Sequence, residues 1–189
     1  MDDQKTKLKT AKRYRFAENY KMTARTAPDG SVTEFVEYIG VYLTAQHTED
    51  QYKAVRILAA VTAGVSLCTA LVLLCVRSFS VYNGGMYVFV PVTVSLLPLL
   101  YQILGALKLP KKDRRLQEDV YRFAHVRIRR SCAGIVVLLL AATILAVVFF
   151  LSTRSALQLP DILFFILLLL PTIMNLLLFR KIGTLNYEK

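Results

Sequence analysis

The amino-acid sequence predicts an all-α membrane protein with four transmembrane helices and a small cytoplasmic N-terminal β-hairpin. Three observations lead to this fold class. Four long stretches carry no charge, the basic residues gather at one set of their ends, and a tight-turn motif precedes the first stretch. With 55% apolar residues and a mean hydropathy of +0.46, the 189-residue chain is also more apolar than an ordinary soluble domain.

The four uncharged stretches are long enough to cross a bilayer. They contain no Asp, Glu, Lys, Arg or His, and they comprise residues 57–76, 85–107, 131–152 and 162–179. About 20 apolar residues, at ~1.5 Å of rise per residue, cross the ~30 Å hydrocarbon core, where an ionisable side chain is costly. Each stretch is therefore predicted to be a transmembrane helix.

Basic residues are distributed asymmetrically about these stretches. Of the 24 Lys and Arg residues, all but Arg77 and Arg154 lie before the first stretch (residues 1–56), in the loop between the second and third stretches, or in the C-terminal tail. Because short loops rich in Lys and Arg stay on the cytoplasmic side, a multi-pass protein of the plasma membrane with both termini in the cytoplasm is predicted. The net charge of +11 then indicates contact with anionic lipid headgroups at the cytoplasmic face. Nucleic-acid binding is not expected, because it needs a basic folded domain with base-reading elements.

The N-terminal segment, residues 1–48, contains the turn motif. Pro28-Asp29-Gly30 has the residue types of a tight turn, and the flanking segments 20–25 and 31–44 complete the pattern of a β-hairpin. The alternative is a flexible tail with a tyrosine-rich patch. Because an isolated hairpin is marginally stable in water, residues 38–43 are expected to pack on the middle loop or on the membrane interface.

Helical extensions are expected to lead into the first and third stretches. Thr48-Glu49-Asp50-Gln51 is a capping-box sequence that begins the first helix near Glu49. After Pro110, the spacing of Leu116, Val120 and Ile128 predicts a cytoplasmic amphipathic helix that continues into the third stretch.

The two halves of the chain share local motifs. Glu-Asp-x-Tyr-basic occurs at 49–53 and 118–122, Val-Arg-Ile occurs at 55–57 and 126–128, and a proline precedes an amide by four residues late in the second and fourth stretches. The offsets between the copies are 69, 71 and 73 residues, which one or two small insertions would explain. We interpret this as a tandem parallel duplication of a two-helix hairpin, comprising residues 49–110 and 111–189. The alternative is that membrane hairpins commonly share basic and aromatic ends.

Pro98, Gln102, Pro171 and Asn175 form the candidate intramembrane polar site. A proline removes one backbone N–H and disturbs the carbonyl four residues earlier, and in lipid such groups need partners within the protein. Each amide follows its proline by one turn, on roughly the same helix face. Two interpretations remain open: a functional polar site between the halves, or interhelical hydrogen bonds worth about 0.6–2 kcal/mol each.

A second candidate site is a basic surface for lipid or a partner. Its arginines are Arg114, Arg115, Arg127, Arg129 and Arg130. No catalytic, cofactor or metal site is expected, because the stretches lack ionisable groups, no phosphate-binding glycine loop occurs, and the three cysteines lack metal-ligand spacing. The sequence therefore favours a non-enzymatic accessory or scaffold subunit that binds a protein partner or forms a homo-oligomer. The alternative is an oligomeric pore or carrier that uses the proline–amide positions.

Overall fold

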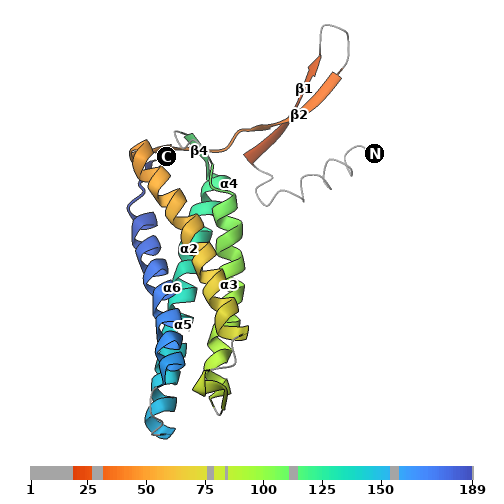
Figure 1. Ribbon diagram of the computed structural model, residues 1–189. Coiled ribbons are helices and arrows are strands. Elements are labelled where there is room, and N and C mark those ends of the chain that lie inside the picture. Colours follow the sequence, from red (N-terminus) through yellow and green to blue (C-terminus); the bar gives the residue numbers. More distant parts are fainter. Residues whose placement is uncertain are drawn as a thin grey trace.

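The computed structural model describes residues 19–26, 32–75, 79–83, 85–110, 115–153 and 158–188. Four helical segments in this part of the chain are long and apolar enough to cross a membrane, and they run side by side (Figure 1). They are α2 (Glu49–Cys75), η3 with α3 (Met86–Val88 and Phe89–Leu107), α4 through α5 (Glu118–Tyr121 to Arg127–Thr153) and α6 (Leu159–Gly183). The described residues of all four predicted stretches are thus helical, apart from Gly85, which precedes η3.

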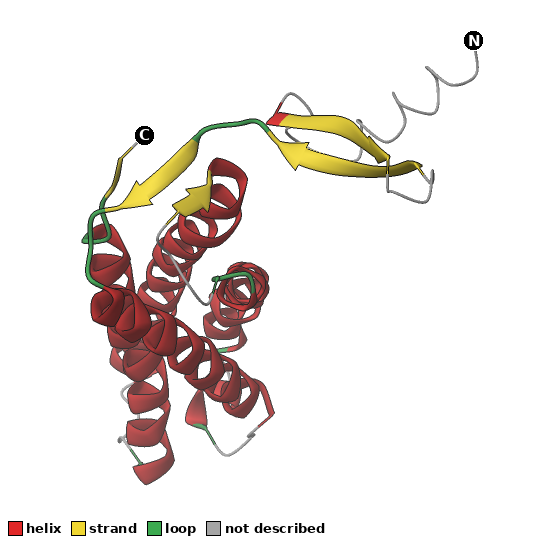
Figure 2. Cartoon of the chain, turned by 90° about the horizontal axis from the view of Figure 1, so that it is seen from above, coloured by secondary structure: helices red, strands yellow, loops and turns green. Residues whose placement is uncertain are grey.

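The helices form a ring in which each one packs on two neighbours. α2 packs on α3 and α6, and α5 packs on the same two helices. α2 and α5 therefore occupy opposite corners of the ring, as do α3 and α6. Figure 2 shows this arrangement from the end that carries the strands.

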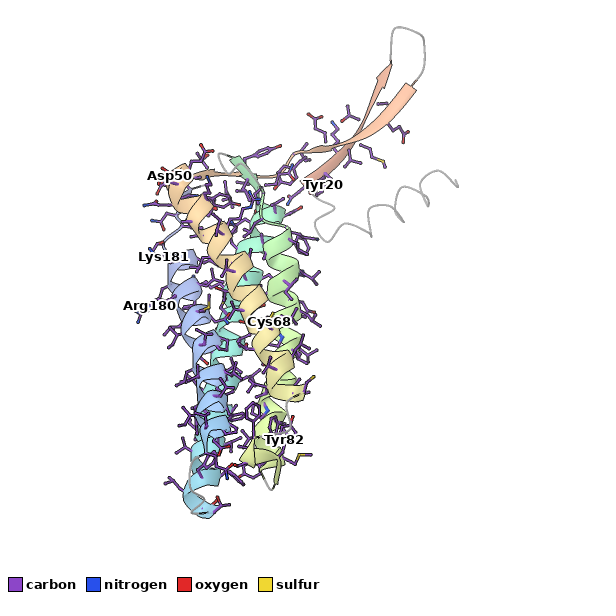
Figure 3. All side chains as sticks on the ribbon, in the orientation of Figure 1. Tyr20, Asp50, Cys68, Tyr82, Arg180 and Lys181 are labelled. Carbon is purple, nitrogen blue, oxygen red and sulfur yellow. The ribbon has the colours of Figure 1, made fainter. Side chains whose placement is uncertain are left out.

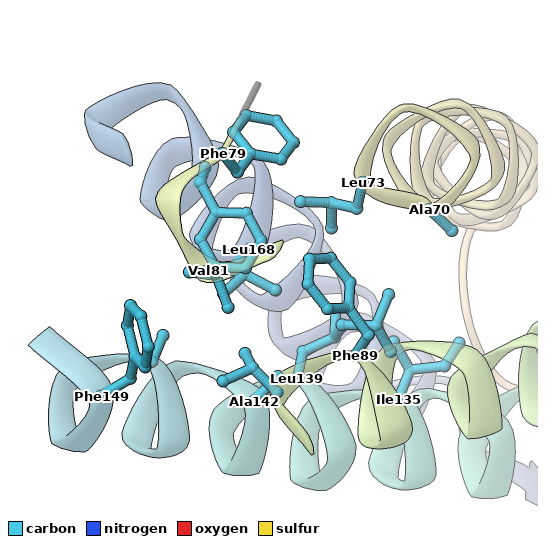
Figure 4. Close-up of a cluster of buried hydrophobic side chains, with 14 of the residues drawn as sticks. Ala70, Leu73, Phe79, Val81, Phe89, Ile135, Leu139, Ala142, Phe149 and Leu168 are labelled. Atoms are coloured by element: carbon cyan, nitrogen blue, oxygen red, sulfur yellow. The ribbon is translucent and has the colours of Figure 1, made fainter. Parts of the chain in front are cut away.

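Buried apolar side chains fill the ring in two clusters. The larger cluster includes Leu73 of α2, Phe89 of α3, Ile135 of α5 and Leu168 of α6 (Figure 4). The smaller cluster includes residues near the strand-bearing end, among them Tyr52, Val55, Ala124, Ile128 and Leu178. All four helices thus contribute to the core.

Large apolar side chains also cover the outside of the ring (Figure 3). Leu71, Leu97, Val137 and Ile166, one from each helix, are all exposed. A soluble monomer rarely exposes a contiguous apolar patch of more than a few hundred Å². This distribution is the one expected of a bundle surrounded by hydrocarbon.

The N-terminal β-hairpin is confirmed. β1 (Tyr20–Thr26) and β2 (Val32–Tyr38) pair antiparallel, from Tyr20 opposite Tyr38 to Thr26 opposite Val32. The predicted turn residues lie outside the described part of the chain, and the second strand ends at Tyr38 rather than continuing to Thr44. In Figure 1 the hairpin extends away from the bundle.

A second sheet joins three polar segments at one end of the bundle. β3 (Tyr42–Ala45), which precedes α2, pairs antiparallel with β4 (Arg115–Gln117) and with β5 (Tyr187–Glu188), which follows α6. Leu43 lies opposite Leu116, and both are buried, whereas Ile39 and Val41 are exposed. The chain after the hairpin therefore packs on the middle loop, one of the two surfaces expected for it.

The segment before α5 differs from the single helix that its spacing indicates. Leu116 lies in β4, α4 begins at Glu118, and a π-helical turn, η4 (Arg122–Val126), separates α4 from α5. Residues 115–117 hydrogen-bond to β3 and not to a helical turn, and one apolar residue between polar neighbours, as Leu116 is here, fits either structure. By contrast, the capping box of α2 forms as predicted, with Thr48 N donating to Gln51 Oε1 at 3.3 Å and Gln51 N donating to Thr48 Oγ1 at 3.4 Å.

At the opposite end, Asp161 joins the two short loops. Its carboxylate accepts hydrogen bonds from Ser80 N at 2.9 Å, Ser80 Oγ at 2.8 Å and Gln158 N at 3.1 Å. Ser80 begins the 3-10 turn η2 (Ser80–Asn83), and Asp161 lies in the first turn of α6, where the helix dipole favours negative charge. These donors explain how a carboxylate can be fully buried there.

Candidate functional site

Gln102 and Asn175 meet in the centre of the ring. The side-chain nitrogen Nε2 of Gln102 donates to Oδ1 of Asn175 at 3.0 Å, which links α3 to α6. Nδ2 of Asn175 donates to Ser66 Oγ at 2.9 Å and to the backbone oxygen of Pro171 at 2.8 Å. Both amides are 0% exposed. One hydrogen-bond network therefore spans α2, α3 and α6.

Cys132 adds the fourth helix to this network. Its sulfur lies 3.6 Å from Gln102 Nε2, the geometry of a weak hydrogen bond. Ser66, Gln102, Cys132 and Asn175, one residue from each helix, are called the polar layer below. In the interior of a membrane protein, such contacts hold helices together and fix their relative positions.

Two buried side-chain oxygens, one in the polar layer and one on α2 a turn before Ser66, have unused hydrogen-bonding capacity. Within the described residues, Oε1 of Gln102 and Oγ1 of Thr62 are buried and have no hydrogen-bond partner. Leaving a buried polar atom unpaired costs about 1–3 kcal/mol. A cavity of about 10 Å³ is lined by Ser66, Ser95 and Pro171, among others, and this is close to the volume that one water molecule needs.

Three of the four predicted polar-site residues come together, and Pro98 does not join them. Pro171 is buried and supplies the carbonyl that Asn175 binds. Pro98 is half-buried and lines a groove on the outside of the bundle, between α3 and α5. It lies beside Gly134 of α5, where an added β-carbon would be 3.5 Å from Pro98 Cβ, an ordinary van der Waals contact.

The structure describes only part of the predicted basic surface. Arg114 lies outside the described residues, and Arg115 is known only as backbone in β4. Arg127, Arg129 and Arg130 all lie in the first turn of α5. No carboxylate of the described residues lies within 4.0 Å of these three guanidinium groups.

Aromatic rings hold two of these arginines on opposite sides of α5. The guanidinium carbon of Arg127 lies 5.1 Å from the ring centre of Tyr101 on α3 and 5.5 Å from that of Phe123. The guanidinium carbon of Arg129 lies 5.0 Å from the ring centre of Phe179 on α6. Each such cation–π contact contributes about 0.5–1 kcal/mol at an exposed site, so both side chains have preferred positions.

Two grooves flank α5 at this end. The α3–α5 groove has a volume of about 1160 Å³ and is lined by residues that include Leu97, Pro98, Tyr101, Arg127 and Arg130. The α5–α6 groove is smaller, about 340 Å³, and its lining includes Arg129, Arg130 and Phe179. Arg130 is exposed and lines both grooves.

Sequence reasoning missed an aromatic cluster at the strand-bearing end. The hydroxyl of Tyr187 in β5 lies 3.1 Å from Nε2 of His125 in the π turn, and rings of His47, Tyr52 and Tyr121 surround this pair. A signal was present, because Tyr52 and Tyr121 occupy the same place in the two Glu-Asp-x-Tyr-basic motifs. The cluster brings together the three segments that the sheet also joins.

Other chemistry is sparse in the part of the chain that the structure describes. No group of three or more His, Cys, Asp or Glu side chains is placed to hold a metal ion there. Cys68 and Cys75 are exposed on α2, and Cys132 is buried in the polar layer.

No protein-family model, curated protein or solved structure matches this chain. The function proposed below therefore rests on the fold and the side chains of this chain.

Proposed function

We propose that this chain is a non-enzymatic scaffold or accessory subunit of the plasma membrane, with both termini in the cytoplasm. The length and apolar surface of its four helices support insertion into a bilayer. The strand-bearing end adjoins the segments that carry nearly all Lys and Arg residues, which supports a cytoplasmic location for that end.

A reporter enzyme that is active only outside the cytoplasm tests the orientation. Fused to the C-terminus it should be silent, and inserted into the loop at residues 154–157 it should be active. Activity at the C-terminus would overturn the proposed orientation.

The scaffold role rests on one observation, the sheet β4-β3-β5. Its backbone hydrogen bonds tie three polar segments into one platform, and the hairpin directly precedes its strand β3 in the chain. Tyr38 fixes the base of the hairpin, because its hydroxyl donates to Val41 O at 3.0 Å and accepts from Glu118 N at 3.2 Å. A hairpin held in this way loses little entropy when a partner binds it.

Exposed apolar residues on the hairpin suit a protein partner. Met22 and Val36 are cross-strand partners, and they are 44% and 43% exposed. Side chains directly opposite each other in an antiparallel pair lie on the same face, so these two form a small apolar patch. Lys21 and Glu37 are the neighbouring cross-strand pair and lie on the other face.

Purification from native membrane in mild detergent, followed by mass spectrometry, tests the scaffold role. A partner that co-purifies with the wild type should be lost from Met22→Ser plus Val36→Ser. It should be retained by Lys21→Gln plus Glu37→Gln, which changes the opposite face and leaves the net charge unaltered. A wild-type protein that retains no partner, or a partner that both double variants retain, would refute a role for this hairpin.

The two helix pairs are further proposed to be a tandem duplication. Burial supports this, because many buried positions recur after a constant 73 residues. Such pairs include Val55 and Ile128, Ser66 and Leu139, Ser95 and Leu168, Leu99 and Thr172, and Gln102 and Asn175. Equivalent helices also occupy opposite corners of the ring, as a two-fold axis along the bundle would require.

An oligomeric pore or carrier is the second candidate. The observation that favours it is the pair of unpartnered buried oxygens, Gln102 Oε1 and Thr62 Oγ1, together with the small cavity beside Ser66. Polar groups of this kind could bind a solute if the helices separated. Flux into reconstituted vesicles tests this candidate: transport that survives Gln102→Leu plus Asn175→Leu would remove it.

A further inference from the structure

We propose that the α3–α5 groove binds one anionic phospholipid, with the lipid phosphate at Arg127 and Arg130 and an acyl chain along Leu97 and Pro98. This inference rests on the membrane placement proposed above, but it requires no protein partner. Basic pockets between transmembrane helices on the cytoplasmic side are suited to anionic headgroups.

The lining of the groove carries an excess of positive charge. Its ionisable side chains include Glu118, Arg122, Arg127 and Arg130. Glu118 Oε1 lies 2.9 Å from Arg122 Nη2, so this ion pair neutralises itself. Two guanidinium groups without a carboxylate partner among the described residues remain, and guanidinium is the side-chain group best matched to phosphate oxygens.

Arg127 is held in position before any ligand arrives. The rings of Tyr101 and Phe123 lie within 5.5 Å of its guanidinium carbon. A cation–π contact is an attraction to the ring face and uses no hydrogen-bond acceptor, and the guanidinium has five N–H donors with which to bind an anion. Fixing this long side chain in advance lowers the entropy cost of binding.

The groove changes from polar to apolar along α3. Tyr101 and Leu97 line it, and Val94 and Val90 continue the same helix face toward the other end of the bundle. All four side chains are exposed. A lipid with its headgroup at the arginines would lay its acyl chain on this face, in the leaflet on the strand-bearing side. A soluble phosphate compound would leave the apolar face unused, and for this reason we assign a lipid.

Native mass spectrometry of the full chain in mild detergent tests the site. The chain is titrated with dioleoylphosphatidylglycerol, with dioleoylphosphatidylcholine and with inorganic phosphate. The wild type should bind one phosphatidylglycerol in preference to phosphatidylcholine. Arg127→Gln plus Arg130→Gln should weaken that binding about 30-fold, because each basic residue contributes about 1 kcal/mol and 1.4 kcal/mol is tenfold in affinity.

A matched control removes the same charge outside the groove. Arg180 and Lys181 are exposed in the last turn of α6 and do not line the α3–α5 groove. Arg180→Gln plus Lys181→Gln should therefore change the affinity less than about threefold, because salt screens distant charges. An equal loss in both double variants would overturn the site in favour of a diffuse charge effect.

Two further arms keep the test decisive. Arg130→Gln alone should weaken binding about fivefold. Because Arg130 is exposed, this single variant should fold, and it tests the site even if the double variant does not fold. Equal binding of phosphatidylcholine, or displacement of the lipid by inorganic phosphate, would overturn the assignment to an anionic lipid. Lipid binding and partner retention are separate measurements, so failure of the scaffold role leaves this result interpretable.

Discussion

Asn175→Leu should destabilise the bundle more than Gln102→Leu, although the two amides hydrogen-bond to each other. Leucine has the branching of asparagine, so Asn175→Leu replaces an amide by methyl groups of similar shape. It removes the bonds to Gln102 and Ser66 at 3.0 and 2.9 Å, and also the bond to the Pro171 carbonyl. It also leaves Gln102 buried with only the weak contact to Cys132.

The magnitudes follow from this difference in partners. An interhelical hydrogen bond in a membrane protein is worth about 0.6–1.7 kcal/mol, and a stranded buried amide adds about 1–3 kcal/mol. Asn175→Leu removes two such bonds and strands one amide, so it should cost about 2–6 kcal/mol. Gln102→Leu removes the unpartnered Oε1 but leaves Oδ1 of Asn175 without its donor. These two effects offset each other, so the cost should be that of one interhelical hydrogen bond, about 0.6–1.7 kcal/mol. The double variant should be about 1 kcal/mol more stable than the sum of the single changes, because the amide stranded by the first change is gone.

Reversible unfolding by SDS in mixed micelles, followed by circular dichroism, measures these free energies. Thr62→Val is a matched control, because it removes a buried hydroxyl that has no partner within the described residues. It should leave the free energy of unfolding unchanged or raise it. If Gln102→Leu costs as much as Asn175→Leu, or if the two changes add, the described hydrogen bonds do not govern the polar layer.

Three other predictions concern the ends of the bundle and can be measured by thermal unfolding and size-exclusion chromatography. Tyr38→Phe should cost about 0.5–1.5 kcal/mol. Burial raises the pKa of the Tyr38 phenol above its usual 10, so its contribution is full below pH 10 and should fall as the pH rises further, a loss that the Phe variant would not show. Asp161→Asn should cost about 1–3 kcal/mol, because a neutral amide replaces a carboxylate that accepts three hydrogen bonds. An unchanged free energy of unfolding would show that Asp161 does not hold the two short loops together. Deleting Arg122 from the π turn should give a monodisperse protein, because a π turn can shorten to an α turn. Deleting the exposed Val137 of α5 should not, because it rotates the rest of that helix by about 100°. If the two deletions behave alike, the π turn is not an insertion in an α-helix.

The helices could be predicted because the cost of burying charge acts at every position. The first stretch begins at Ile57, after Arg56, and the last ends at Phe179, before Arg180. Both limits follow from the local sequence, without knowledge of any tertiary contact. The pairing of Gln102 with Asn175 was also within reach, because both amides lie in charge-free stretches of the sequence at matching places. That Ser66 and Cys132 complete the layer depends on the order of helices in the ring, which the sequence does not encode locally.

The sheet β4-β3-β5 was beyond sequence reasoning for a different reason. β4 and β5 contain three and two residues, which is too short for an alternating pattern to be recognised. Leu116 fits the helical spacing of its neighbours as well as it fits a strand, and only its partner Leu43, far away in the chain, decides between them. Asp161 is similar, because its burial depends on Ser80 in another loop.

The π turn accounts for the drift in spacing between the two proposed copies. The Glu-Asp-x-Tyr-basic motifs are 69 residues apart, whereas the buried faces of α2 and α5 are 73 apart, as for Val55 and Ile128. Under the proposed duplication, the second copy has four extra residues after Tyr121, where the π turn lies. Four residues advance an α-helix about 40° beyond a full turn, and a turn that closes five residues on, not four, takes up part of this excess. α5 thereby keeps its buried face toward the bundle, and Arg127 and Arg129, which are two residues and so about 200° apart on α5, face the two grooves on its opposite sides.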